Sequence, residues 1–292
     1  MITRLLAAFL ILLAPLARAQ DRPVVATVNY PLAYFTERLA GDAVEVLFPV
    51  PDGVDPAFWR PGIADIATIQ QADLIVLNGA GYAAWTTRAS LPRSRLVDTS
   101  RGLQDRLIET ETVTHSHGAD GAHSHAAVAS HVWLDPALAM VQADAVAGGL
   151  VRAGLLAEDS AGAALDPLKA DLAALDEAGR AAFAPHAGQV ILASHPRYHY
   201  LARAHGVEVS ALDWGAGEMP DDDQWRALSA LVSDTGATLF LWEAAPPPDA
   251  AARLAELGLT GVVYPSLGWA PETGDFLSAQ HDALAAIAAA GG

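Results

Sequence analysis

Short apolar runs rich in Val, Ile and Leu alternate along the chain with segments in which apolar residues recur at helical spacing. This alternation is typical of β-α units stacked around a mainly parallel sheet. Strands are predicted in the first half at 24–28, 44–50 and 74–78, and in the second half at 190–194, 207–212, 238–242 and 261–264. Helices are predicted between them at 31–39, 64–72, 198–205, 224–233 and 248–257. The pattern therefore predicts two α/β lobes.

Residues 137–184 separate the two groups of strands and are rich in Ala and Leu. A helical pattern runs from 161 to 183, with Pro167 in its first turns, where proline is best tolerated. At 1.5 Å per residue this helix is about 35 Å long. We expect two Rossmann-like lobes joined by one long rigid helix, with a ligand cleft between them. The predicted division is an N-terminal lobe at 20–136, the helical segment at 137–184 and a C-terminal lobe at 185–292.

The first 19 residues have the order of regions found in a secretory signal peptide. A basic start ending at Arg4 precedes an apolar run at 5–16 and a small-x-small site at Ala17-Arg18-Ala19. The apolar run is too short for a membrane anchor. The sequence contains no cysteine, which excludes a lipid-modified cysteine, disulfides and Cys-based zinc sites. The expected mature protein is soluble and periplasmic.

The chain is strongly acidic, with a formal net charge of −17. Removal of residues 1–19 takes away Arg4 and Arg18, which leaves 15 basic against 34 acidic residues and a net charge of −19. This charge repels nucleic acid and anionic membranes, and it attracts cations. Nucleic-acid binding is excluded on this ground.

The most distinctive segment is a histidine-rich loop at 114–130, in which most of the other residues are Gly, Ala and Ser. Its histidines are His115, His117, His123 and His125. Small side chains and glycines do not pack as a helix or strand, so these imidazoles are free to coordinate a cation. Imidazole suits zinc, copper and nickel better than calcium or magnesium. We interpret the loop as a low-affinity metal collector, against the alternative of a solvated linker.

The sequence resembles a known family, the metal-binding solute-binding proteins of zinc and manganese ABC importers, and the zinc-uptake branch in particular. The resemblance runs from about Val24 to the C-terminus. Its motifs are Tyr30-Pro-Leu32, Pro51-Asp-Gly-Val-Asp-Pro56, Ile69-Gln-Gln-Ala-Asp73, Asn78-Gly-Ala-Gly81, Trp85, the histidine-rich loop, His131-Val-Trp-Leu-Asp-Pro136, Ser194-His195 and Glu243. In that family three histidines and a carboxylate converge on one zinc ion between the lobes.

The resemblance places His131 and His195 on two of the four ligand positions. Both positions also agree with the residue pattern. His131 follows a predicted strand end and precedes Asp135-Pro136, which can start a helix, while His195 ends the apolar run 190–194. Side chains at the ends of strands in α/β lobes face the crevice where ligands bind.

Two ligands that the resemblance implies are missing. The position after Asp55-Pro56, where the first family histidine is expected, is Ala57, and no acidic residue lies near Pro265. Because zinc is normally four-coordinate, two histidines alone do not complete a high-affinity site.

Other residues are candidates for the missing positions. His123 and His125 are close enough in sequence to fold back toward His131. Glu243 lies at the end of the predicted strand 238–242. It is a candidate metal ligand or, as we favour, a hydrogen-bond partner of a ligand histidine. His199 follows His195 by one helical turn and shares its face, or lies on the helix surface.

An alternative interpretation starts from two arginines. Arg60 lies beside the missing histidine and Arg197 lies two residues after His195. A guanidinium repels a bare divalent cation. Aromatic residues that could form walls around such a cleft are Trp59, Tyr198, Trp214 and Trp269. This set would suit an organic anion or a chelated metal.

The sequence thus predicts a monomeric periplasmic solute-binding protein that carries Zn²⁺, with Mn²⁺ as second choice, to an ABC permease. A periplasmic metallochaperone is a second candidate partner. An enzyme is not expected, because the chain has neither a Gly-x-Ser-x-Gly motif nor a His-Glu-x-x-His helix. The alternative is a divergent member whose cleft binds a chelated metal or an organic anion.

Overall fold

The structure is a computed structural model and describes residues 22–110 and 127–291. The predicted signal peptide and the four histidines of the histidine-rich loop lie outside these residues. No helix among the described residues is long and apolar enough to cross a membrane.

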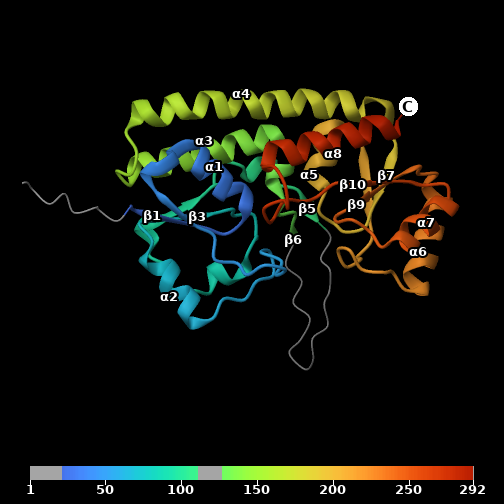
Figure 1. The fold of residues 1–292 in the computed structure, drawn as a ribbon, viewed down its shortest axis with the longest axis horizontal. Helices are drawn as coiled ribbons and strands as arrows, with labels where there is room; N and C mark the ends of the chain where they lie inside the picture. The colour runs from blue at the N-terminus through green and yellow to red at the C-terminus, as the bar shows by residue number, and fades with distance from the viewer. Residues whose placement is uncertain (1–21, 111–126, 292) are drawn as a thin grey trace, which may run out of the picture.

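Two four-stranded parallel sheets form the two lobes (Figure 1). The N-terminal sheet has the order β2-β1-β3-β4 and the C-terminal sheet has the order β10-β9-β7-β8. The strands of the first sheet are β1 (Val24–Thr27), β2 (Glu45–Leu47), β3 (Leu74–Leu77) and β4 (Leu96–Asp98). Those of the second are β7 (Val190–Ala193), β8 (Glu208–Ala211), β9 (Leu239–Trp242) and β10 (Thr260–Val263). A short antiparallel pair, β5 (Glu109–Thr110) and β6 (Ala127–Val128), lies between them.

The helices cover the sheets and connect the lobes. Those associated with the first sheet are α1 (Tyr30–Ala40), α2 (Ile63–Gln71) and α3 (Pro136–Arg152). Those of the second are α5 (His199–His205), α6 (Asp222–Thr235), α7 (Pro248–Glu256) and α8 (Phe276–Ala290). The connecting helix is α4 (Glu158–Phe183). This arrangement confirms the predicted fold class.

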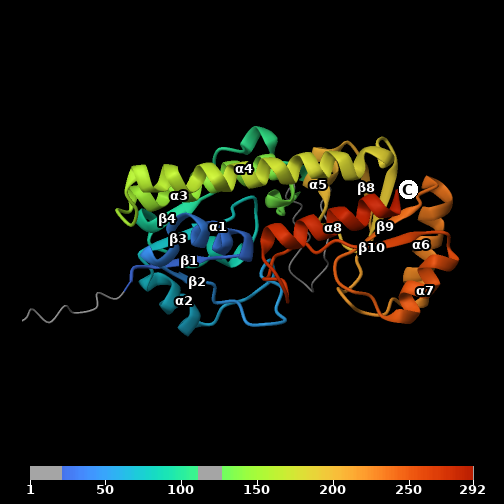
Figure 2. The ribbon, with the colours of Figure 1, turned by 45° about the horizontal axis from the view of Figure 1, so that its top comes forward.

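Helix α4 runs over both lobes and packs on α3 at one end and α8 at the other (Figures 1 and 2). Its 26 residues make it about 39 Å long. It begins at Glu158, three residues earlier than the pattern indicated, so Pro167 lies in its interior and not in its first turns. The proline removes one backbone hydrogen bond there, and the packing of buried Leu168, Leu172 and Leu175 maintains the helix.

One apolar core continues beneath α4 from one lobe to the other. It includes Leu32 of α1, Leu172 of α4, Ile191 of β7 and Ile287 of α8. The lobes are also joined by hydrogen bonds. The indole Nε1 of Trp133 donates to the Ser266 carbonyl at 2.7 Å, and the Tyr30 amide donates to the Gly268 carbonyl at 3.0 Å. The strand ends of the two lobes are therefore held at a fixed separation.

The helix starts follow simple capping chemistry. Four helices begin after a residue whose side chain accepts a hydrogen bond from a backbone N–H of the first turn. These residues are Asn29 for α1, Asp135 for α3, Asp221 for α6 and Asp275 for α8. The run Asp221-Asp222-Asp223 is thus an acidic cluster at a helix N-terminus, where the helix dipole favours negative charge. Strand β4 and helix α8 were not among the predicted elements, since β4 has only three residues and α8 is almost uniformly apolar, without a clear amphipathic period.

His205, at the end of α5, gives a test of how the core depends on pH. Its ring stacks on Phe183 with centroids 5.1 Å apart and lies over Gly179, where a Cβ atom would be 2.3 Å from it. Burial lowers the pKa of His205 to about 4, while Asp176 raises it and Arg180 lowers it by smaller amounts. In the unfolded chain a histidine takes up its proton near pH 6.5. The unfolded state therefore binds the proton first as the pH falls.

We predict that His205 alone removes up to about 3 kcal/mol of stability as the pH falls from about 6.5 to 4. His205→Phe keeps a ring against Phe183 without the titration, so its urea-unfolding free energy should fall less over this range than that of the original chain. His281→Gln, which changes an exposed histidine of α8, is the control. Equal losses in the original chain and in His205→Phe would contradict this account.

Candidate functional site

The carboxyl ends of the strands in the two lobes supply the polar residues between them. Glu243 follows β9 directly, His195 lies two residues after the end of β7, and Ser266 follows β10. From the N-terminal lobe, Asp55 lies in the loop after β2 and His131 precedes the turn before α3. Loops at the carboxyl edge of a parallel sheet are the usual place for a ligand site.

Arg197 occupies the centre of this region and contacts both lobes. Its Nη1 lies 3.0 Å from His131 Nε2, and its Nη2 donates to Asp55 Oδ2 at 2.5 Å. Its Nε lies 2.9 Å from Glu243 Oε1, an ion pair without the alignment of a hydrogen bond. We call Arg197, Asp55, Glu243 and His131 the arginine cluster.

The arginine cluster is largely shielded from solvent. The side chains of Arg197 and Glu243 are 7% and 5% exposed, and that of Asp55 is 23% exposed. Burial opposes the charge of the guanidinium, but Glu243 and Asp55 together outweigh it, so the pKa of Arg197 is raised. Two carboxylates thus share one buried monovalent cation.

His131 is buried as a neutral ring. Burial, and after it the neighbouring Arg197, hold the pKa of His131 well below its usual range. The ring contacts Trp133 and Tyr82, with centroids 4.8 Å and 5.7 Å away. Because an arginine can only donate, Nε2 of His131 is the acceptor and its proton is on Nδ1. The lone pair that a metal would use is therefore taken by Arg197.

His195 has the opposite arrangement. Its Nδ1 lies 2.9 Å from the Trp214 carbonyl and donates to it, which leaves Nε2 with a free lone pair. The nearest acid is Asp213, whose Oδ1 is 3.8 Å from Nε2. A ring fixed through Nδ1 with Nε2 free is the usual state of a metal-ligating histidine.

A cavity of about 570 Å³ lies beside the arginine cluster, between the two lobes. Its lining includes His131, His195 and His199, together with Ala57 and Glu109. Burial lowers the pKa of His199, and its Nδ1 has no hydrogen-bond partner among the described residues. The three histidines thus reach one cavity. Over the described ranges, however, no three His, Cys, Asp or Glu side chains are close enough together to hold a metal ion.

The fold and the site allow comparison with known proteins. A family model described as "ZnuA: Zinc-uptake complex component A periplasmic" matches residues 24–290. The chain belongs to this family. It is a family of extracytoplasmic metal-binding solute-binding proteins, not of enzymes, which confirms the resemblance stated above.

Individual relatives are more distant. The high-affinity zinc uptake system protein ZnuA of Bacillus subtilis is 28% identical over 73% of this chain and 66% of its own length. The zinc-binding lipoprotein AdcA of Streptococcus pneumoniae is 26% identical over 80% of this chain and 47% of its own length. The match thus spans about half to two thirds of these relatives. The crystal structure of the metal-dependent lipoprotein YcdH from Bacillus subtilis is similar in fold, with a TM-score of 0.76, 22% identity and coverage of 92% of this chain and 98% of that one.

Both departures from the ZnuA-family pattern have a structural counterpart. The amide of Ala57 donates to Asp55 Oδ1 at 2.9 Å, so the loop is turned by the carboxylate that also binds Arg197. Near Pro265, the residue directed at the site is Ser266, whose hydroxyl donates to Glu243 Oε1 at 2.7 Å. Glu243 is therefore held by Ser266 and Arg197, and it does not line the cavity.

The remaining predicted residues are distributed over other environments. Tyr198 is fully buried and its hydroxyl donates to the Tyr264 carbonyl at 2.7 Å, while Trp214 is buried in the C-terminal core. The indole of Trp269 donates to the Val54 carbonyl at 2.6 Å. The candidate loop histidines His115, His117, His123 and His125 lie outside the described residues.

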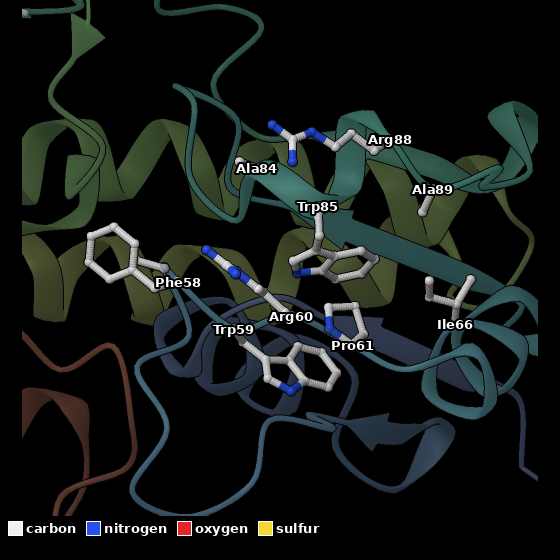
Figure 3. A pocket seen from close by; sticks show the side chains of 10 residues that line it. Phe58, Trp59, Arg60, Pro61, Ile66, Ala84, Trp85, Arg88 and Ala89 are labelled. Carbon is white, nitrogen blue, oxygen red and sulfur yellow. The ribbon is translucent and has the colours of Figure 1, made fainter. Parts of the chain in front are cut away.

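Trp59 and Arg60 line a second cavity of about 440 Å³ in the N-terminal lobe (Figure 3). Trp85 and Arg88 also line it, and Ala57 and Phe58 belong to both cavities. Within residues 22–110 and 127–291 the guanidinium group of neither Arg60 nor Arg88 has an ion pair or a hydrogen bond.

Asp55 and Ser266 were not recognised as site residues from the sequence. Asp55 belongs to the quoted motif 51–56, but its partner is 142 positions away. The available signal was an arginine after one strand together with acidic residues after two other strands. Such a pattern shows which side chains are charged, but it does not show that they contact one another.

The arginine cluster predicts a large effect of a small change at Glu243. Glu243→Gln keeps the shape but removes the negative charge next to Arg197 Nε, and breaking a buried ion pair costs about 3 kcal/mol or more. We expect a loss of this size in the free energy of unfolding by urea. Glu218→Gln, at an exposed acid, should change stability by less than about 0.5 kcal/mol. Similar values for the two variants would show that the Glu243 ion pair contributes little.

Proposed function

We propose that this chain is a periplasmic solute-binding protein that captures a divalent transition-metal ion in the cavity between its lobes and delivers it to an ABC permease. Zinc is the first choice of metal and manganese the second. Membership of the ZnuA family supports the general role, and the two relatives described above are named for zinc. The single observation that carries the proposal is the presence of three imidazoles, His131, His195 and His199, at one cavity.

Within this proposal His195 is the first ligand, because its Nε2 is free and its ring is already oriented. His131 is the second, once Arg197 has released its Nε2. His199 and Glu109 line the same cavity and are available to complete the coordination, as are His123 and His125 of the histidine-rich loop. Imidazole-rich donor sets favour zinc over the hard cations.

The wider assignments extend the same proposal. Residues 1–19 act as a cleaved signal peptide, the lobes comprise 20–136 and 185–292 around the helical segment 137–184, and the protein works as a monomer. The strong negative charge favours encounter with cations. His115, His117, His123 and His125 collect metal at low affinity, and a periplasmic metallochaperone is a second candidate partner beside the permease.

We predict that the double variant His131→Ala, His195→Ala loses tight zinc binding in the cavity. Zinc calorimetry should be done on protein lacking residues 115–125, so that the loop contributes no imidazole of its own. Without two nitrogen ligands the affinity should fall by about a hundredfold or more, since each lost ligand is exchanged for water.

The matched control is His186→Ala, His281→Ala, which removes two histidines that do not line the cavity. Protein with the intact loop should bind additional zinc weakly. Unchanged tight binding in the first double variant would overturn the cavity assignment.

The second cavity supports a second candidate function, binding of an organic anion or of an anionic metal chelate. The observation in its favour is the pair Arg60 and Arg88 beside Trp85, since guanidinium groups bind carboxylates in a bidentate manner. We predict that citrate, alone or with zinc, raises the melting temperature of the original chain but not that of Arg60→Met, Arg88→Met. Chloride at matched ionic strength is the control. No citrate effect on the original chain would eliminate this candidate.

A further inference from the structure

Arg197 links the two lobes and uses the groups that a metal ion would need. We propose that Arg197 is a built-in competitor of the cargo: its guanidinium fills the centre in the absence of metal and must be displaced before His131 binds the ion and Asp55 and Glu243 compensate its charge. This inference rests on the proposed function, because it concerns the same site. It adds the residue that regulates access to that site.

Occupation by arginine and by metal exclude each other on geometric grounds. His131 Nε2 has one lone pair, and Arg197 Nη1 lies 3.0 Å from it. A zinc ion on this nitrogen would be about 2.0 to 2.1 Å away along the same direction. The ion and the guanidinium nitrogen would then overlap, and their like charges would repel strongly in a buried setting.

The charges of the arginine cluster also favour exchange of the guanidinium for a metal ion over departure of the guanidinium without a replacement. Asp55 and Glu243 both face Arg197. If the guanidinium leaves and no other cation replaces it, two carboxylates remain without a counter-charge in a site that is mostly buried, which is costly. A divalent cation compensates both of them, whereas a monovalent ion restores only the existing balance. The cluster therefore disfavours an empty state and selects for higher charge.

The displaced side chain has a place to go. Arg197 itself lines the 570 Å³ cavity, so its guanidinium can move into open space without a shift of the backbone. The ring of Phe58, which is 71% exposed, lies 5.8 Å from the guanidinium carbon on this side. An aromatic face at this distance stabilises a cation that moves toward solvent.

The test is Arg197→Met, which keeps the unbranched stem and removes the charge. We expect its zinc affinity, measured by calorimetry against a competing chelator, to rise about tenfold or more, because the competitor is gone. Arg226→Met removes an exposed arginine on α6 and should leave the affinity unchanged. Addition of Asp55→Asn to Arg197→Met should cancel most of the gain.

The outcomes separate this inference from the proposed function. If the original chain binds zinc and Arg197→Met binds it equally or more weakly, Arg197 is not a competitor although the function stands. If only Arg197→Met binds zinc, the inference holds and capture of the free ion by the original chain is wrong. If neither binds, both fail.

A readout on the original chain removes the dependence on a variant that fails to fold. The Arg197 Nε–H and the His131 ring nitrogens can be followed by ¹⁵N NMR during zinc titration. We expect the Arg197 Nε–H to exchange faster with water and His131 Nε2 to shift in the same step. A shift of His131 with an unchanged Arg197 signal would overturn the inference.

Discussion

The packing of both lobes against one continuous helix is the constraint on which the site depends. Helix α4 contacts α3 in one half of the molecule and α8 in the other, and the apolar core beneath it is continuous. The ends of β7 and β9 are consequently held opposite the loops that carry Asp55 and His131. A single guanidinium can bridge residues from different lobes only because this separation is fixed.

Between the lobes, the site is organised by the ion pairs of Arg197 with Asp55 and Glu243 more than by a preformed set of metal ligands. His195 is oriented and free, while His131 is oriented and occupied. The two positions that depart from the family pattern, Ala57 and Ser266, both contact the carboxylates that hold Arg197. The two positions without an expected ligand and the central arginine are therefore parts of one arrangement.

The sequence was a good guide to the fold because strand and helix periodicity is local. All seven strands listed from the pattern are present with boundaries shifted by a few residues, and the helix from 161 to 183 was recognised. His131 and His195, which the sequence singled out, line one cavity. Their role as ligands stays a prediction.

Other features of the site could not be read from the sequence in the same way. The contact between Arg197 and Asp55 joins residues 142 positions apart, and no periodicity encodes such a pair. Aromatic residues near the motifs, such as Tyr198 and Trp214, are core residues in the fold. Their aromatic rings would suit the wall of a binding site equally well. Only the direction of each side chain distinguishes a core residue from a residue that lines a site.

The continuous core under α4 also has a consequence for how the chain folds. A cut on either side of this helix would expose the apolar faces of α1, α3 and α8 to water, so one face of each sheet would lose its cover, although the other face keeps a smaller apolar cluster. We therefore expect the two sheets to unfold together, as one cooperative unit. The two halves of the site are thus assembled in the same event that folds the chain.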